Sequence, residues 1–246
     1  MGKALAQLGK FTVMLRKSWS KPENMALYWR AFIDQCVDIG LRSFWIIIAV
    51  SFFLGMVVTM QTAYMLTVPA IPKSVIGMVA RDSVILELGP TGIAAVMATV
   101  VGFRIASELG YMRMSEQIDA QEVMGINTYA YLVLPKILAS VLVMPCLTVI
   151  GCFVGLLAGG FAGESMKLVA FSDYLFGLTD RFKPNTVSIA IVKSYVFAFI
   201  IPSVSAYVGY HVVGDSLAVG KAATRAVTYT CVAILMADYI VTSLML

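Results

Sequence analysis

Apolar residues gather along this chain in five long runs, separated by segments rich in polar and charged residues. The runs cover residues 44–66, 84–103, 129–159, 186–210 and 226–246. A helix of about 20 apolar residues crosses the roughly 30 Å of hydrocarbon in a bilayer. Lipid accepts only helices or closed barrels, and these runs are too long and continuous for barrel strands. The pattern therefore predicts an all-α integral membrane protein with five transmembrane helices.

An amphipathic pattern precedes the first run. Ser20-Lys21-Pro22 is typical of a helix start, and apolar residues then recur at spacings of three and four between Met25 and Val37. Polar residues fill the other face, so this helix is too polar to span. We expect residues 1–42 to form an N-terminal segment whose helix lies along the membrane interface, followed by a transmembrane domain at 43–246. A soluble packing helix is the alternative.

The composition, with 60% hydrophobic and 13% charged residues, leaves too few charges to cover a soluble domain. Twelve Lys and Arg residues lie in the N-terminal segment, around the loop between the second and third runs, and in the loop between the fourth and fifth runs. Five lie in the other two loops, which are on the opposite side of the membrane. The positive-inside rule places the N-terminus in the cytoplasm and, after five crossings, the C-terminus in the periplasm. A basic, Met-rich chain without a transit peptide fits a multi-pass protein of a bacterial inner membrane, with a plastid membrane as the alternative.

The loop at 104–128 holds a second helical signal. Glu116, Asp119 and Glu122, spaced three apart, form an acidic stripe along a short helix. Ser115 can cap the start of this helix, and Gly125 can end it. A short cytoplasmic helix of this kind is what an ATPase partner needs to grip a permease. An ordinary solvated loop helix is the alternative.

Three ionisable residues lie inside the apolar runs: Glu87, Lys193 and Asp238. A charge in the bilayer costs about 2.5–3.5 kcal/mol, so these side chains should face protein or water. We expect Glu87 or Asp238 to neutralise Lys193. The cluster then either binds a lipid headgroup or only fixes helix packing.

Glycines recur every fourth residue at 151, 155, 159 and 163. This spacing lets two helices approach closely, within the chain or between two copies. No Gly-Lys-Ser/Thr sequence follows, so the glycines are not a phosphate loop.

Ser, Cys and His residues are never placed as a nucleophile and its base, and a lone His211 cannot complete a metal site. We expect a transport subunit rather than an enzyme, with no metal, no cofactor and no nucleic-acid partner. Because a Walker motif is absent from the sequence, ATP would be used by a partner subunit.

The segment from 87 to 127 carries a specific resemblance. Glu87-Leu-Gly-Pro90, Ala106-Ser-Glu-Leu-Gly110, Glu116-Gln-Ile-Asp-Ala120 and Glu122-Val-Met-Gly-Ile-Asn127 resemble the MlaE/YrbE family, the permeases of MCE-type ABC lipid transporters. The similarity covers roughly residues 28–246. It implies a homodimer with an elbow helix and five spans per chain, a cytoplasmic ABC ATPase and a periplasmic MCE-domain lipid-binding partner.

The resemblance also implies site residues. The coupling helix that docks into the ATPase matches Glu116, Gln117, Ile118, Asp119 and Ala120, with Glu122 beside it. The lipid pocket at the dimer interface matches Phe53, Val57, Met60, Gln61 and Tyr64 on one helical face, together with Glu87. The family usually has a Gly-Arg pair midway through the second span, where this chain has Thr99-Val100, and we expect Arg104 to take the place of that arginine.

We therefore expect the permease subunit of an ABC transporter that moves phospholipid or another hydrophobic lipid between this membrane and an MCE-domain partner. An ion-coupled secondary transporter, or a membrane lipid-handling protein outside the ABC class, is the alternative. The chain has no sign of the inverted repeat typical of secondary transporters.

Overall fold

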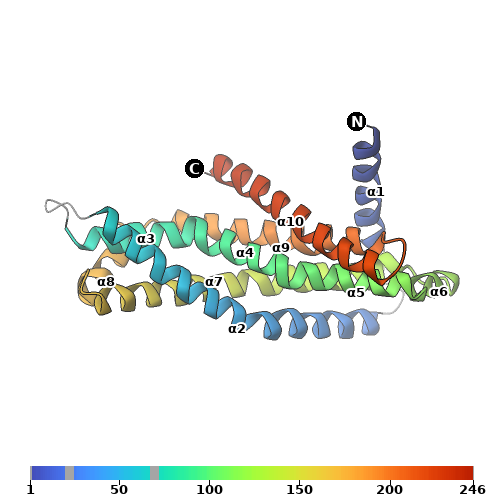
Figure 1. Cartoon of the computed structure of the whole chain (residues 1–246), viewed down its shortest axis with the longest axis horizontal. Coiled ribbons are helices and arrows are strands. Elements are labelled where there is room, and N and C mark those ends of the chain that lie inside the picture. The colour runs from blue at the N-terminus through green and yellow to red at the C-terminus, as the bar shows by residue number, and fades with distance from the viewer. Residues whose placement is uncertain (1, 20–24, 67–71, 246) are drawn as a thin grey trace. The chain divides into compact units, whose positions relative to one another are not determined.

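The computed structural model describes residues 2–19, 25–66 and 72–245, and every regular element within them is a helix (Figure 1). Among these residues, five helical segments are long and apolar enough to cross a membrane. They are α2 (Met25–Met65), the composite helix Ser74–Met114, the composite helix Tyr129–Ser165, α9 (Pro184–Tyr210) and α10 (Ser216–Met245). The predicted all-α fold with five spans is confirmed, and each helix extends beyond its apolar run.

Two of the spans change their winding along their length. The second span consists of α3 (Ser74–Ser83), η1 (Val84–Gly92), α4 (Ile93–Met97), η2 (Ala98–Gly102) and α5 (Phe103–Met114), of which η1 and η2 are π-helical. The third begins with the π-helical η3 (Tyr129–Val133) and continues as α7 (Leu134–Ser165). Widened π turns frequently mark functional sites, and η1 also contains Pro90.

The N-terminal segment differs from its sequence prediction in two respects. Residues 25–42 form the beginning of α2, which continues unbroken into the first span, since no proline interrupts the chain between Met25 and Met65. A further helix, α1 (Gly2–Ser18), was not predicted. The expected helix start at residues 20–22 lies outside the described residues, and the interfacial placement stays a prediction.

Internal contacts divide the chain into two units. Unit 1 comprises Met1–Ser43, Met97–Val143 and Phe197–Met236, and unit 2 comprises Phe44–Val96, Met144–Val196 and Ala237–Leu246. The loops predicted to be cytoplasmic belong to unit 1, and the loops predicted to lie on the other side belong to unit 2. Consecutive loops along the chain therefore belong to alternate units.

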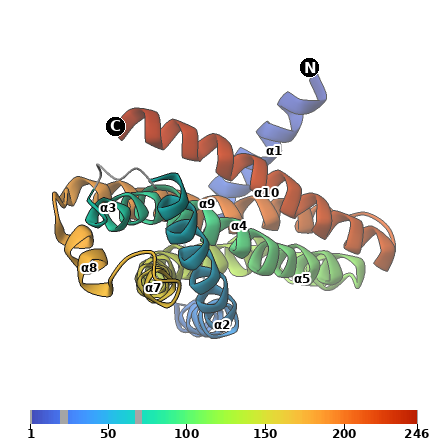
Figure 2. The ribbon, with the colours of Figure 1, turned by 60° about the vertical axis from the view of Figure 1, so that its left-hand side comes forward.

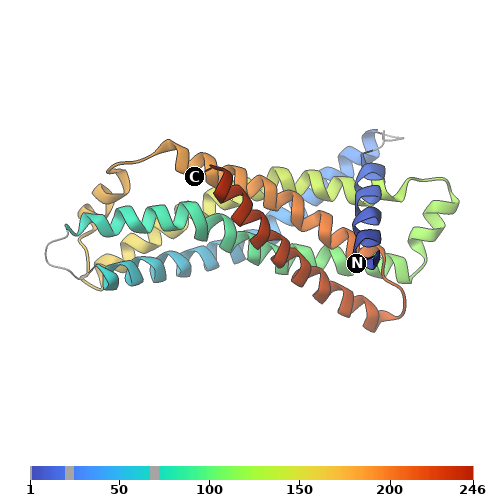
Figure 3. The same ribbon diagram turned by 90° about the horizontal axis from the view of Figure 1, so that it is seen from above.

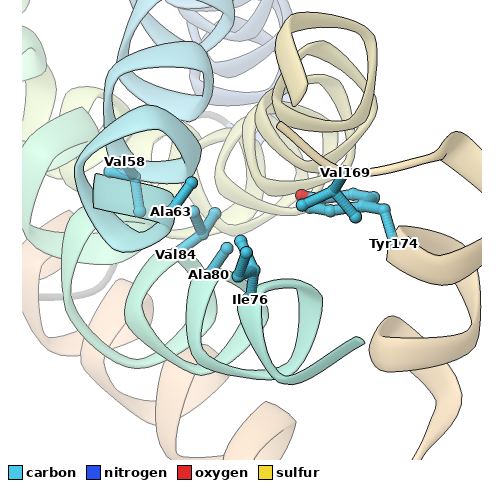
Figure 4. Packing of buried hydrophobic residues seen from close by; sticks show 7 residues of the cluster. All are labelled: Val58, Ala63, Ile76, Ala80, Val84, Val169 and Tyr174. Atoms are coloured by element: carbon cyan, nitrogen blue, oxygen red, sulfur yellow. The ribbon is translucent and has the colours of Figure 1, made fainter. Parts of the chain in front are cut away.

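The core of unit 2 includes a helix that the sequence analysis missed. Helix α8 (Phe171–Thr179) lies beside α3, and a Cβ atom at Gly177 would lie 2.0 Å from the Ser74 carbonyl oxygen (Figure 2). Tyr174 of α8 is buried in an apolar cluster beside Val169 (Figure 4). Its hydroxyl donates to the Leu156 carbonyl oxygen at 3.1 Å. Burial raises the pKa of the Tyr174 phenol.

The glycines spaced four apart on α7 pack against α2 inside unit 2. A Cβ atom at Gly55 would lie 1.9 Å from the Gly155 carbonyl oxygen, and one at Gly159 would lie 2.2 Å from the Thr59 hydroxyl. The two backbones approach closely because neither glycine carries a side chain. The packing prediction is confirmed, with the contact made inside one chain.

Unit 1 uses the same device between α5 and α9. A Cβ atom at Gly209 would lie 2.6 Å from the Ala106 carbonyl oxygen. Ala106 is fully buried, together with Ala223 and Ala226 of α10. Small residues thus hold these helix ends together and set the position of the loop at 115–128 that follows α5.

Candidate functional site

Lys193 on α9 is the centre of a charged cluster in unit 2, and its side chain is 0% exposed. Its Nζ donates to Glu87 Oε1 at 2.8 Å and to Asp238 Oδ1 at 2.9 Å. The sequence analysis expected one of these carboxylates to neutralise the lysine. The structure brings both to it.

Helix η1 supplies a third acceptor: Lys193 Nζ donates to the Leu86 carbonyl oxygen at 2.9 Å. On the next turn, the Thr91 hydroxyl donates to Asp238 Oδ1 at 3.1 Å. Residues 86–91 of η1 thus contact both α9 and α10.

The cluster carries two carboxylates for one ammonium, a formal charge of −1. An ammonium has three N–H donors, and those of Lys193 have three acceptors within 2.9 Å, so none is left over for a lipid phosphate. Glu87 is 48% exposed and Asp238 only 17%, so the excess negative charge faces outward through Glu87. This arrangement favours the helix-packing hypothesis for Lys193.

The five residues expected to line a lipid pocket lie on α2 in unit 2. Phe53, Val57, Gln61 and Tyr64 are exposed on one face, and Met60 is half-buried. The opposite face of α2 is the one that packs on the glycines of α7. The expected pocket residues therefore form an outward-facing surface of the single chain, with a polar Gln61 among apolar and aromatic side chains.

Unit 1 contains a short helix, α6 (Gln117–Val123), at the position where the coupling helix was expected, and its coupling role stays a prediction. Ile118 is fully buried and anchors the helix, whereas Glu116, Gln117 and Ala120 are exposed. Val123 is also exposed, at 89%. The helix thus presents polar and apolar atoms to its surroundings.

The ends of α6 only partly follow the sequence prediction. Gly125 has φ +81°, its N–H donates to the Glu122 oxygen, and the Ile126 N–H donates to the Gln121 oxygen. These two bonds are a Schellman motif, so Gly125 closes the helix as predicted. Ser115 does not cap it: its hydroxyl donates to the Tyr111 oxygen of α5, because the serine directly follows that helix and serves its last turn.

Two acidic side chains of the expected stripe are bonded within unit 1. Asp119 Oδ1 accepts from Arg113 Nη1 at 2.6 Å. Glu122 Oε1 accepts from the Tyr210 hydroxyl at 2.6 Å, and the Thr128 hydroxyl lies 2.7 Å from the Tyr210 oxygen. These bonds tie α6 to α5 and to the end of α9.

Sequence reasoning missed the aromatic support of this network. The Tyr210 ring stacks on Tyr129 at 4.4 Å between centroids, and the Arg113 guanidinium lies 5.8 Å from the Tyr210 centroid. Lys17 of α1 lies 5.6 Å from the Tyr129 centroid. Tyr210 is 88 residues from Glu122, so no local spacing could have joined them.

Arg104 on α5 forms an ion pair with Asp38 of α2, with Nη2 to Oδ2 at 2.5 Å. Asp38 also accepts from Arg42 at 2.9 Å. Lys136 of α7 bonds Glu108 of α5 at 2.7 Å in the same unit. Arg104 thus joins the second span to the first, whereas its equivalence to the arginine of the Gly-Arg pair stays a prediction.

Comparison with known proteins gives one consistent result. The sequence model of the family "Permease MlaE" matches residues 32–244. A "Probable ABC transporter permease protein" of Rickettsia bellii is 34% identical over 241 residues, which are 98% of this chain and 93% of the relative.

Two further relatives have more specific names. The "Intermembrane phospholipid transport system permease protein MlaE" of Haemophilus influenzae is 24% identical over 239 residues, covering 97% of this chain and 91% of the relative. "Protein TRIGALACTOSYLDIACYLGLYCEROL 1, chloroplastic" of Arabidopsis thaliana is 30% identical over 217 residues, covering 88% of this chain and 62% of the relative.

Proposed function

The chain belongs to the MlaE permease family, and from that premise we propose that it is the membrane subunit of an ABC transporter that moves phospholipid or another hydrophobic lipid. The Rickettsia relative is named as a probable ABC transporter permease protein, and the Haemophilus relative is named for phospholipid transport. ATP is hydrolysed by a separate subunit, and the chain itself carries out no covalent chemistry.

The main support for this proposal is the pattern of buried and exposed residues on α6. The helix has one buried anchor, Ile118, and exposed residues at Glu116, Gln117 and Ala120. Its acidic side chains are held by Arg113 and Tyr210. A short helix fixed at its base and exposed on its outer side can pass a push from a docked ATPase into α5 and α9.

The lipid pocket is formed when two copies bring their α2 faces together. Phe53, Val57, Gln61 and Tyr64 are exposed on one chain and would be covered in such a homodimer. Apolar side chains with one polar amide suit acyl chains and a linkage group. Glu87 adds the outward negative charge of the Lys193 cluster to the same unit.

The complete complex contains two copies of this chain, an ATPase and an MCE-domain protein that exchanges lipid with the permease. The chain lies in a bacterial inner membrane with its N-terminus in the cytoplasm, where α6 meets the ATPase. The MCE-domain protein stands on the periplasmic side. The positive-inside count supports this orientation.

A matched pair of substitutions tests the docking role of α6. Ala120→Arg places a long cation on the exposed side of α6, and Ala170→Arg makes the same change at an exposed position before α8 in unit 2. Both avoid the internal bonds of Asp119 and Glu122. The complex is purified from membranes and assayed for ATPase content, ATP hydrolysis and lipid transfer between liposomes.

We expect Ala120→Arg to lose the ATPase subunit or to uncouple hydrolysis from transfer, and Ala170→Arg to behave as wild type. The docking role fails if the two variants behave alike. The wider assignment fails if the wild-type chain purifies without an ATPase.

A further inference from the structure

A groove of about 860 Å³ lies in unit 1 and is lined by residues of α1, the end of α9 and the start of α10. The ribbons of these three segments can be followed in Figure 3. Phe11 of α1 packs edge-on against Tyr207 of α9 at 5.5 Å between ring centroids. The Tyr207 hydroxyl donates to the Gln7 carbonyl oxygen at 3.2 Å. These contacts hold α1 against α9 and form one wall. The volume lies in the range of about 300–1,000 Å³ that is usual for small-molecule sites.

The groove combines an apolar lining with two cations. Val204 and Val208 of α9 and Ala222 of α10 supply apolar surface. Lys221 and Arg225, four residues apart on the same face of α10, line it as well and are exposed. Neither cation has an ion-pair partner within residues 2–19, 25–66 and 72–245.

The position of these cations along α10 indicates their depth in a membrane. Lys221 and Arg225 lie in the first three turns of the helix, immediately before the apolar run at 226–246. Basic residues at the end of an apolar run lie at the level of the lipid phosphates. A basic pocket between membrane helices at this level is suited to an anionic headgroup.

We propose that this groove binds an anionic phospholipid of the surrounding membrane. Lys221 and Arg225 contact the phosphate through charge-assisted hydrogen bonds. An acyl chain lies against Val204, Val208 and Ala222. The site belongs to unit 1 and is distinct from the α2 face of unit 2, and it does not rest on the transport proposal.

The test uses the full chain, purified in detergent with the subunits that accompany it and stripped of lipid. Phosphatidylglycerol and phosphatidylcholine are titrated separately, and bound lipid is counted by native mass spectrometry. The variant Lys221→Gln/Arg225→Gln removes both groove cations. The control Arg16→Gln/Arg30→Gln removes two exposed cations of unit 1 that do not line the groove.

Loss of the two groove cations should weaken phosphatidylglycerol binding about 10- to 30-fold and phosphatidylcholine binding much less, because the choline cation already offsets the charge of its phosphate. The control variant should bind both lipids as wild type does. If both double variants lost the same amount of phosphatidylglycerol binding, general surface charge would explain the effect and the proposed site would be overturned. Equal binding of the two lipids by the wild-type protein would also overturn it.

Two further arms examine the rest of the groove. Ala222→Trp fills the apolar part and should lower the binding of both lipids, and undiminished binding would place the lipid elsewhere. A benzoylphenylalanine in place of Tyr229, which also lines the groove, should cross-link to phospholipid on illumination in native membranes. Cross-linking to a protein subunit in place of lipid would overturn the proposal.

Discussion

The charged cluster of unit 2 and the polar network of unit 1 join helices by contrasting chemistry. In unit 2 a fully buried ammonium, Lys193, is held by two carboxylates and a carbonyl oxygen. In unit 1 an exposed carboxylate, Glu122, is held by the neutral hydroxyls of Tyr210 and Thr128. The first cluster neutralises a charge that cannot reach water, and the second positions a charge that can.

Because of this difference, we expect the two clusters to contribute differently to the stability of the chain and to the position of α6. If a partner of a buried charge is removed, the remaining charge has nothing to compensate it. If Tyr210 loses its hydroxyl, water can solvate Glu122. The unit 2 cluster should therefore dominate the stability of the chain, whereas the unit 1 network should mainly set the position of α6.

The largest effect is expected for Lys193→Met. It leaves Glu87 and Asp238 without their shared cation and should lower the free energy of unfolding by about 3–5 kcal/mol. Thermal and denaturant unfolding of the purified protein in detergent measure this loss. Lys183→Met, which removes an exposed lysine of the same unit, is the matched control and should be nearly neutral.

Double variants show whether the loss comes from uncompensated charge. Lys193→Met/Asp238→Leu removes the more buried carboxylate and should recover most of the loss. Lys193→Met/Glu87→Leu should recover less, because Glu87 is 48% exposed and water can solvate it. The pairing account fails if neither double variant is more stable than Lys193→Met.

The spans could be predicted from the sequence because a helix that crosses the hydrocarbon of a bilayer needs a long run of apolar residues. Helices α1 and α8 could not, because neither carries an apolar run of spanning length and the position of each depends on contacts distant in sequence. For α8 the decisive contact is the close approach of Gly77 and Gly177, 100 residues apart, which no periodicity reveals.

The candidate sites could likewise be predicted only in part, because some of their contacts join residues that are distant in sequence. The cost of a buried charge predicted a carboxylate partner for Lys193. It did not predict the Leu86 carbonyl, because a backbone oxygen carries no signal in the pattern of side chains. For α6, the motif indicated the helix and Gly125 its end, but the Tyr210 support arises only when α9 folds back onto the loop.

A smaller effect is expected for Tyr210→Phe. It removes the hydroxyl bonded to Glu122 and should cost about 0.5–1.5 kcal/mol of global stability. Amide hydrogen exchange at residues 117–124 should nevertheless rise clearly, because α6 loses a tie to α9. Tyr111→Phe, which changes an exposed tyrosine on α5, is the control. Unchanged exchange in Tyr210→Phe would show that the hydroxyl does not position α6.

The smallest effect is expected for the Arg113–Asp119 pair, both of whose side chains are a third or more exposed. A double-mutant cycle of Arg113→Gln and Asp119→Asn should give a coupling energy of about 0.2–1 kcal/mol, because solvent screens the pair. Raising the salt to about 1 M, where the Debye length is about 3 Å, should reduce it further. A coupling energy as large as the Lys193→Met loss would mean that unit 1 also depends on a strongly desolvated charge. The contrast between the two units would then no longer hold.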